Sequence, residues 1–419
     1  MEELLSGMLL YRGAAEDPLL RSLCAPGAAL RERQSQLPRL LAFAEENAVS
    51  GNLWQTYLTW RILNDENPWA LACEGRGDPG GSLSRLARGD MERFRRLLHL
   101  ELPPLAQELR GELLNYEPGA GRSPSPAVAR LCRLRDRLVS AHYADELLSR
   151  CAEAYREMGV GDFALCAAFR AGEHGSLTPI RDMAAAPLSA LVGYEDQKRL
   201  LRENTAAFLA GRESNHVLLY GDAGTGKSTC VRALLTEFEG SALRLVELRR
   251  AHFEALPELL AALRRRRCRF LLFIDDLSFE EHETEYKHLK AAIEGGLETM
   301  PENVRVCATS NRRHLIRETW SDRSDMEHDG DLHRSDTVEE KLSLAGRFGL
   351  TIRFDSPDRR LYYEIVERLA AEQSLDLKTE DLHRRADAWA IRHGGLSGRT
   401  AKQFVDAASG QATSNVTIQ

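Results

Sequence analysis

The stretch Gly221–Ser228, with the pattern G-x-x-x-x-G-K-S, constrains the fold of this 419-residue chain more than any other feature. It follows His216–Tyr220, an apolar run typical of a buried strand, and precedes Thr229–Phe238, whose apolar residues recur at helical spacing. Glycines let several backbone N–H groups point at one anion, and the helix dipole adds partial positive charge there. A turn that only joins a strand to a helix is the weaker interpretation. The pattern predicts a phosphate-binding loop for a nucleoside triphosphate.

Two acids follow the next strongly apolar strand, Phe270–Ile274. Ligands bind at the C-terminal ends of parallel strands, which is where Asp275 and Asp276 would lie. We expect Asp275 to hold Mg²⁺, directly or through water, together with the Ser228 hydroxyl. Asp276 would orient or deprotonate the attacking water, and Lys227 would reach the outer phosphates.

A third strand, Val304–Thr309, is followed by Asn311, which is expected to hydrogen-bond the attacking water or the terminal phosphate. Alone, this stretch would equally fit a strand that ends in an Asn turn. From Leu191 onward, strands alternate with helices, which predicts a parallel sheet with helices on both faces. The expected strands are His216–Tyr220, Leu243–Leu248, Phe270–Ile274, Val304–Thr309 and Leu350–Phe354.

The order of these motifs resembles the AAA+ ATPase superfamily over about residues 187–408. Leu344–Leu350 is similar to the arginine-finger segment of that family, in the form that bacterial replication-initiator ATPases have. Gly394–Arg399 resembles its second sensor, and Leu191–Tyr194 resembles the segment that packs on the adenine. The chain further resembles a group of uncharacterised bacterial AAA+-type ATP-binding proteins, a domain-of-unknown-function family. The residues in and around these motifs that carry this resemblance are Val192-Gly-Tyr, Asn204-Thr and Asp275-Asp-Leu-Ser-Phe-Glu280.

The resemblance implies two arginine roles. Arg347 would act from a neighbouring subunit, so that a homo-oligomer carries nucleotide at its interfaces, and Arg399 would contact the phosphates of its own subunit. A guanidinium can neutralise the charge that spreads over the transferring phosphoryl group. Surface ion pairing remains open for both arginines. The expected catalytic residues are thus Asp276, Asn311, Arg347 and Arg399; the metal ligands are Ser228 and Asp275; and the residues that contact ATP are Val192, Gly193, Gly221, Asp222, Ala223, Gly224, Thr225, Gly226, Lys227, Ser228 and Thr229.

Two departures from the family pattern qualify these roles. Most members have Asp-Glu where this chain has Asp-Asp, and the shorter Asp276 would sit farther from the water. Glu280 or Glu281 could substitute for it, and slow hydrolysis or nucleotide-dependent switching stays open. The region around Phe253 has the aromatic residue but not the glycine of the loop that protein-unfolding members use, which weakens polypeptide threading as a function.

Outside the nucleotide-binding region, patterns are less specific. Residues 1–170 carry helical periodicity, as in Leu37–Ala48, Leu53–Leu63, Met91–Leu100 and Pro126–Met158. This region would bind a partner or regulate the rest of the chain. Trp54, Trp60 and Trp69 would line a binding face or, as we favour, pack in the core. The predicted organisation is an all-helical domain at 1–170, a linker at 171–190, an α/β nucleotide-binding domain at 191–356, a helical lid at 357–408 and a flexible tail at 409–419.

Composition limits the partners and the cellular location that the sequence predicts. A net charge of −7 gives no global basic field for nucleic acid, and no apolar run is long enough to span a membrane. The eight scattered cysteines favour reduced core thiols, and with no secretory signal this predicts a cytoplasmic protein. Arg264–Arg267 could bind nucleic-acid backbone, but a solvated helix end is favoured. Trp320–Glu340 is polar, which favours a solvated insertion; a metal site at its His and Asp residues has no supporting ligand spacing.

The function expected is an ATPase that couples ATP and Mg²⁺ binding to remodelling or switching of a macromolecular partner through residues 1–170. Two alternatives stay open. One is a nucleic-acid-associated loader or initiator, which the form of the Arg347 segment favours. The other is a nucleotide-gated binding module with little hydrolysis, which the Asp276 departure favours.

Overall fold

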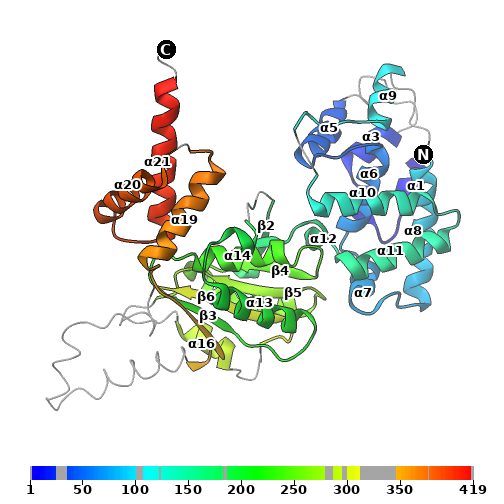
Figure 1. The fold of residues 1–419 in the computed structure, drawn as a ribbon. Helices are drawn as coiled ribbons and strands as arrows, with labels where there is room; N and C mark the ends of the chain where they lie inside the picture. Colours follow the sequence, from blue (N-terminus) through cyan, green and yellow to red (C-terminus); the bar gives the residue numbers. More distant parts are fainter. Residues whose placement is uncertain are drawn as a thin grey trace. The chain divides into compact units, whose positions relative to one another are not determined.

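The chain forms two compact units in the computed structural model (Figure 1). The N-terminal unit comprises Met1–Ala167 and Arg265–Cys268, and the sheet unit comprises Ala168–Arg264 and Arg269–Gln419. The described residues are 2–24, 35–100, 107–121, 124–181, 183, 186–278, 286–294, 300–311, 346–375 and 377–416. Glu280, Glu281 and the polar stretch Trp320–Glu340 therefore lie outside the described residues, as do the first residues of the arginine-finger segment.

The N-terminal unit is helical in its described part, as the periodicity predicts. Its long apolar stretch Pro126–Met158 is two helices rather than one, because the chain leaves helical geometry between Val139 and Ala144. The helices are α1 (Glu2–Ser6), α2 (Arg12–Ala15), α3 (Pro18–Cys24), α5 (Leu37–Glu46), α6 (Leu53–Asn64), α7 (Pro68–Arg76), α8 (Gly81–Leu98), α9 (Gln107–Leu114), α10 (Pro126–Val139), α11 (Ala144–Met158) and α12 (Asp162–Leu165).

The aromatic residues of this unit pack mainly in its core, as favoured from the sequence. Trp54 and Trp69 are buried, and the indole N–H of Trp54 donates to the Leu97 carbonyl oxygen at 2.8 Å. Trp60 is only partly buried and packs beside Phe43, with ring centroids 5.2 Å apart. A buried indole needs a hydrogen-bond partner, which the end of α8 supplies here.

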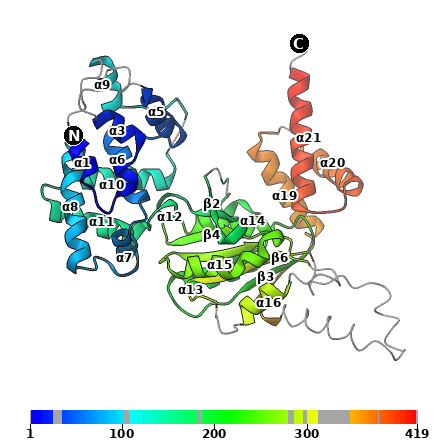
Figure 2. The same cartoon turned by 180° about the vertical axis from the view of Figure 1, so that it is seen from behind.

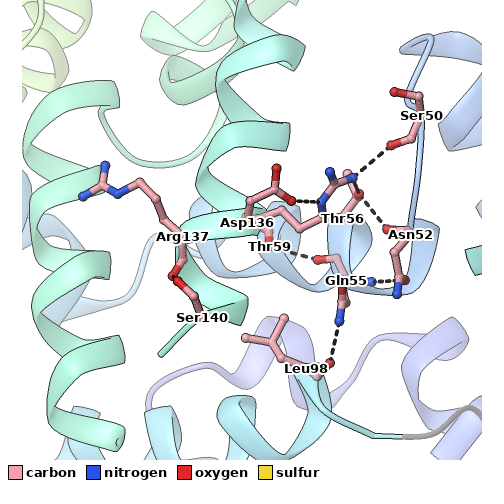
Figure 3. A network of polar contacts seen from close by, with 10 residues as sticks. Ser50, Asn52, Gln55, Thr56, Thr59, Leu98, Asp136, Arg137 and Ser140 are labelled. Atoms are coloured by element: carbon pink, nitrogen blue, oxygen red, sulfur yellow. Dashed lines mark hydrogen bonds and ion pairs between the residues drawn. The ribbon is translucent and has the colours of Figure 1, made fainter. Parts of the chain in front are cut away.

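Polar contacts join α10 to the start of α6 (Figure 3). The Arg135 guanidinium donates to the Ser50 carbonyl oxygen and to the Thr56 hydroxyl, both at 2.9 Å, and to Asp136 at 2.9 Å. The Asn52 side chain caps α6 by accepting from the Gln55 N–H at 3.1 Å. These bonds fix the entry of the chain into α6.

Arg266 corrects the expectation of a solvated arginine run. Its side chain is 8% exposed and lies in the N-terminal unit, where its guanidinium is 3.0 Å from the Glu74 carboxylate and 2.9 Å from Glu66. The guanidinium also packs 4.5 Å from the centroid of the Phe163 ring. Arg266 is buried because the Glu74 carboxylate, itself 2% exposed, needs a cationic partner inside the unit.

Within its described residues, the sheet unit holds seven strands in the order β2-β1-β4-β5-β6-β3-β7. All pairs are parallel except β1 with β2. Each of the five predicted strands is confirmed, with bounds that shift by at most one residue. The strands are β1 (Ala168–Ala171), β2 (Leu177–Ile180), β3 (Val217–Gly221), β4 (Leu243–Glu247), β5 (Arg269–Ile274), β6 (Val304–Ser310) and β7 (Leu350–Phe354).

Helices cover both faces of this sheet, as predicted. Alternation along the strands sends Val217 and Leu219 of β3 into one buried cluster with Leu201 and Leu234, which lie on α13 (Glu195–Leu209) and α14 (Lys227–Glu237). The opposite face packs against α15 (Leu256–Arg264), which is in view in Figure 2, and α16 (Tyr286–Glu294) contacts α15. Short 3₁₀ turns lie at Glu173–Gly175, Leu188–Ala190 and Arg250–Ala255.

Two predicted boundaries are wrong in part. The linker expected at 171–190 contains β2, and the sheet begins at Ala168, before the predicted start at Leu191. The signal was weak because β1 is short and β2 carries Pro179, which an outermost strand tolerates. The tail expected to be flexible at 409–419 is helical to Val416, because the alanines of this segment favour a helix despite its polar composition.

The predicted lid consists of three helices with a core of their own. They are α19 (Arg359–Glu372), α20 (Thr379–Arg392) and α21 (Gly398–Val416), and their apolar faces meet around Tyr362, Val366 and Phe404. In the described part of the chain, no helix combines the length and apolar character that crossing a bilayer requires.

Candidate nucleotide-binding and catalytic site

The loop between β3 and α14 has the backbone of a phosphate cradle. Gly221 has φ +132°, and a side chain there would collide with the Phe354 carbonyl oxygen of β7. Gly226 has φ +93° and forms the N-cap of α14, with the Leu191 side chain packed against its Cα. Only glycine adopts these conformations in such confined space. The first N–H groups of α14 thus lie at the open side of the loop, where they can bind an anion.

Lys227 is held inside this loop. Its ammonium group donates to the carbonyl oxygens of Gly221 at 2.8 Å and of Asp222 at 2.6 Å, and its side chain is buried. Burial lowers the pKa of Lys227, while the carboxylates of Asp222, Asp276 and Asp275 act in the opposite direction. The Thr225 hydroxyl bonds the Asp222 carbonyl oxygen at 2.9 Å and closes the loop from the other side.

The two predicted metal ligands meet directly. The Ser228 hydroxyl donates to Asp275 Oδ1 at 2.5 Å, across 47 residues of sequence. The same oxygen accepts the Thr309 hydroxyl at 2.7 Å, and Arg232 of α14 lies 3.4 Å from Oδ2. A carboxylate beside a hydroxyl is the type of hard oxygen set that Mg²⁺ prefers, so these residues fit the ion.

The two predicted catalytic residues at the strand ends are also paired. The Asn311 side-chain amide donates to Asp276 Oδ1 at 2.9 Å. Asp276 has φ +54°, a left-handed conformation in which Asp and Asn are enriched among non-glycine residues. The Thr309 hydroxyl accepts from the Asp276 N–H at 2.9 Å and helps to hold this turn.

The predicted adenine segment lies between the loop and the lid. Leu191 packs on Gly226 of the phosphate loop, whereas Val192 packs with the lid cluster. Gly193 has φ +77° and abuts Leu361 of α19, so a side chain would not fit there. The Tyr194 hydroxyl donates to the Asp355 carbonyl oxygen at 2.8 Å. Burial raises the pKa of Tyr194 to about 12, so this hydroxyl stays protonated.

The lid reaches the phosphate loop at the start of α21. A Cβ placed on Gly224 would lie 3.0 Å from the Ser397 hydroxyl and 3.1 Å from the Arg399 Cβ. Arg399 is also close enough to Lys227 to contribute to lowering its pKa. The predicted second sensor and the phosphate loop are therefore neighbours within the sheet unit.

Arg347 is not part of this cluster. It is exposed and lies three residues before β7, whereas the phosphate loop follows the C-terminal end of β3. Because Val217 pairs with Leu350 and Gly221 with Phe354 in a parallel ladder, Arg347 and the loop lie at opposite ends of neighbouring strands. The four steps from Leu350 to Phe354 alone span about 13 Å.

Sequence reasoning missed three residues of this site. Thr309 is a β-former in a strand, which gives no signal of its contact with Asp275. Arg232 is an ordinary helix-surface residue by pattern, five positions after Lys227. Ser356 bonds Asp222 through its N–H and its hydroxyl, both at 2.8 Å. Helical spacing from Ser228 could have suggested Arg232; no sequence signal points to the other two.

Comparisons with known proteins place the chain in a family and find solved structures that resemble part of it. The family model described as "Protein of unknown function (DUF815)" matches residues 163–412. No curated protein matches the chain. The Holliday junction branch migration motor RuvB of Thermotoga maritima is similar to this chain with 19% identity and a TM-score of 0.37, over 52% of this chain and 63% of that one. The ADP-bound AAA domain of FIGL-1 has 18% identity and a TM-score of 0.39, over 55% and 76%.

The sheet unit carries four features in chain order. They are the phosphate loop after β3, an acidic turn after β5, a polar turn after β6 and a helical lid after β7. The chain spans less than two thirds of the RuvB structure, so the activity of that whole protein is not transferred to it. The family match covers more than half of the chain and nearly all of the sheet unit. The chain belongs to the DUF815 family of proteins of unknown function, and its sheet unit is a mainly parallel α/β sheet with a phosphate-loop turn and a helical lid.

Proposed function

We propose that this protein binds and hydrolyses ATP with Mg²⁺ and couples the cycle to remodelling or switching of a macromolecular partner. One observation carries the proposal: the Ser228 hydroxyl meets the Asp275 carboxylate at 2.5 Å beside the phosphate loop. In a P-loop protein these are the groups expected to hold the metal ion. Ser228 lies in α14 and Asp275 directly follows β5, and the two side chains are in contact.

Each residue of the site has a proposed role in hydrolysis. The N–H groups of the loop and Lys227 would bind the β- and γ-phosphates, and Arg399 would add positive charge from the lid. Bound Mg²⁺, held by Ser228 and Asp275, would supply charge neutralisation at the phosphate oxygens. Asp276 would orient the attacking water and accept its proton, with Asn311 fixing the carboxylate.

The position of Arg347 supports an oligomer. Since it lies at the other end of β7 from the phosphate loop of its own chain, a role in hydrolysis requires the site of another copy. A guanidinium supplied by a neighbour would make turnover depend on assembly. We therefore propose a homo-oligomer with nucleotide at the subunit interfaces.

The N-terminal unit is the proposed site for the partner. It has its own helical core, and residues 1–162 lie outside the part of the chain that the family model matches. Arg266, the buried member of the Arg264–Arg267 run, is engaged by Glu66 and Glu74, which removes it as a contact for nucleic-acid phosphate. One fewer arginine of this run is thus available to nucleic acid, and the partner proposed here is a protein.

A binding module with little hydrolysis is the second candidate. The observation that favours it is the short Asp276 side chain, whose Oδ1 is already bonded to Asn311. Such a protein would assemble with ATP and release its partner by nucleotide exchange.

The test measures ATP turnover, affinity for a fluorescent ATP analogue and mass in solution with and without ATP–Mg²⁺. We expect Mg²⁺-dependent turnover and assembly for the wild type, and loss of nucleotide binding for Lys227→Ala. Tight binding and assembly without turnover would favour the binding module. A wild type that binds no nucleotide would contradict both candidates.

A further inference from the structure

The Thr309 side chain joins the two acids of the site. It lies one residue before the end of β6 and is 2% exposed. Its hydroxyl donates to Asp275 Oδ1 at 2.7 Å and accepts from the Asp276 N–H at 2.9 Å. Its carbonyl oxygen accepts from the Leu277 N–H at 2.7 Å. One threonine thus bonds three consecutive residues of the turn that follows β5.

These bonds hold a backbone conformation that the turn would not favour by itself. Asp276 has φ +54°, a left-handed conformation that is less favourable for residues other than glycine. The N–H groups of Asp276 and Leu277 lie on either side of the Asp276 Cα. The first donates to the Thr309 hydroxyl and the second to the Thr309 carbonyl oxygen. The direction of the Asp276 carboxylate toward Asn311 follows from that constraint.

The Asp275 carboxylate has two further partners, but both are more exposed. The Arg232 side chain is 46% exposed and lies 3.4 Å away, an arrangement that contributes little in water. The Ser228 hydroxyl lies at the open end of α14, where it would also hold the metal. Thr309 is the partner fixed by a buried central strand, so its position does not depend on solvent or ligand.

We propose that Thr309 is a positioning residue of the ATPase reaction: its hydroxyl sets the orientation of the metal-holding Asp275 and of the backbone that aims Asp276. This rests on the proposed function, because Asp275 holds a metal ion only if the site binds nucleotide with Mg²⁺, and Asp276 acts on water only if the site hydrolyses ATP. Groups that orient a metal ligand typically change metal affinity or activity by about 10–100-fold when removed.

The test compares Thr309→Val, which keeps the shape and removes the hydroxyl, with Thr309→Ser, which keeps the hydroxyl. Thr205→Val is the matched control, because Thr205 is equally buried in α13 and its hydroxyl donates to the Leu201 carbonyl oxygen of the same helix. Three quantities are measured: the Mg²⁺ concentration for half-maximal binding of a non-hydrolysable fluorescent ATP analogue, kcat, and hydrogen exchange at Asp276 and Leu277. Thr309→Cys, a weaker donor, replaces the valine variant where valine prevents folding.

We expect Thr309→Val to raise the Mg²⁺ requirement about tenfold, lower kcat at least tenfold and speed exchange at the Asp276 amide, with metal-free nucleotide affinity unchanged. The Leu277 amide, which bonds the main-chain carbonyl oxygen of residue 309, is the internal reference. Thr309→Ser and Thr205→Val should resemble the wild type. A wild type that binds nucleotide with Mg²⁺ but does not turn over would end the hydrolysis proposal, while the shifted Mg²⁺ requirement would still support the role of Thr309. Unchanged Mg²⁺ requirement and exchange in Thr309→Val would overturn it, whatever the turnover.

Discussion

Asp222 of the phosphate loop and Ser356 ahead of the lid are joined by two hydrogen bonds, each 2.8 Å long. The Asp222 carboxylate accepts from the N–H and from the hydroxyl of Ser356, and these bonds hold its pKa below the usual range. Ser356 stands two residues before Asp358, the N-cap of α19. The loop that would bind phosphates is therefore tied to the segment from which the lid begins.

Removing the hydroxyl in Ser356→Ala should speed nucleotide release. One of the two bonds to a charged group is lost, which is worth about 1 kcal/mol, or roughly a fivefold faster dissociation. Stopped-flow dissociation of a fluorescent ATP analogue measures it. Thr351→Ala removes an exposed hydroxyl from β7 and is the control; equal rates in the two variants would show that the contact does not couple the loop to the lid.

Asp276→Asn should separate binding from hydrolysis. Asparagine tolerates the left-handed backbone as well as aspartate does, so the turn should persist, but an amide cannot accept the proton of the water. Turnover should fall by about 10²–10⁴-fold with nucleotide affinity within twofold of the wild type. Retention of turnover in this variant would assign the base to another group.

The buried His216 makes stability depend on pH. Burial, assisted by Arg305, lowers its pKa to about 4, and its Nδ1 accepts from the Val306 N–H at 2.9 Å. Since the ordinary pKa is about 6.5, the unfolded chain takes up a proton between pH 6.5 and 4 and the folded chain does not. The free energy of unfolding should thus be unaffected above pH 6.5 and fall as pH drops to 4, by on the order of 3 kcal/mol.

His216→Asn tests this pH dependence, because the Asn oxygen can replace Nδ1 as acceptor and does not titrate. Urea unfolding at pH 7 and pH 4.5 should show a smaller loss of stability in the variant than in the wild type. The same loss in both proteins would mean that other groups account for the acid sensitivity.

Arg266→Met should destabilise the N-terminal unit. The substitution leaves the Glu74 carboxylate, 2% exposed, without its cationic partner, which typically costs about 3–5 kcal/mol. Urea unfolding followed by tryptophan fluorescence reports on Trp54 and Trp69 in this unit. The exposed neighbour Arg265→Met is the control, and the double variant with Glu74→Met should recover most of the loss; a double variant as unstable as the single one would argue against an unpaired charge as the cause.

The sequence predicted the elements whose signals are local. The bounds of β7 coincide with the predicted Leu350–Phe354, since a β-rich run between breakers carries its own signal. Asp275 and Ser228 were assigned together because the motif order places both at one sheet edge. The apolar periodicity of α6 and α10 likewise sufficed to predict that both segments are helical.

What the sequence did not predict depends on residues far apart in the chain. The local pattern predicts a solvated run for Arg266 because its ion-pair partner Glu74 lies 192 residues earlier. Strand β2 contains a proline and makes sense only as the outermost strand of a sheet that other segments build. The role of Thr309 follows from the register of β5 against β6, which no pattern within β6 encodes.

The proposed site of hydrolysis is an interface to which two subunits contribute. The most direct measurement is ATP turnover of Lys227→Ala and Arg347→Ala proteins, alone and mixed, with mass analysis of the mixed oligomer. Each variant should be inactive alone, and the mixture should regain turnover, because a site with intact Lys227 then receives Arg347 from the neighbouring subunit. Wild-type turnover in Arg347→Ala, or an inactive mixture in which mixed oligomers are present, would contradict the account.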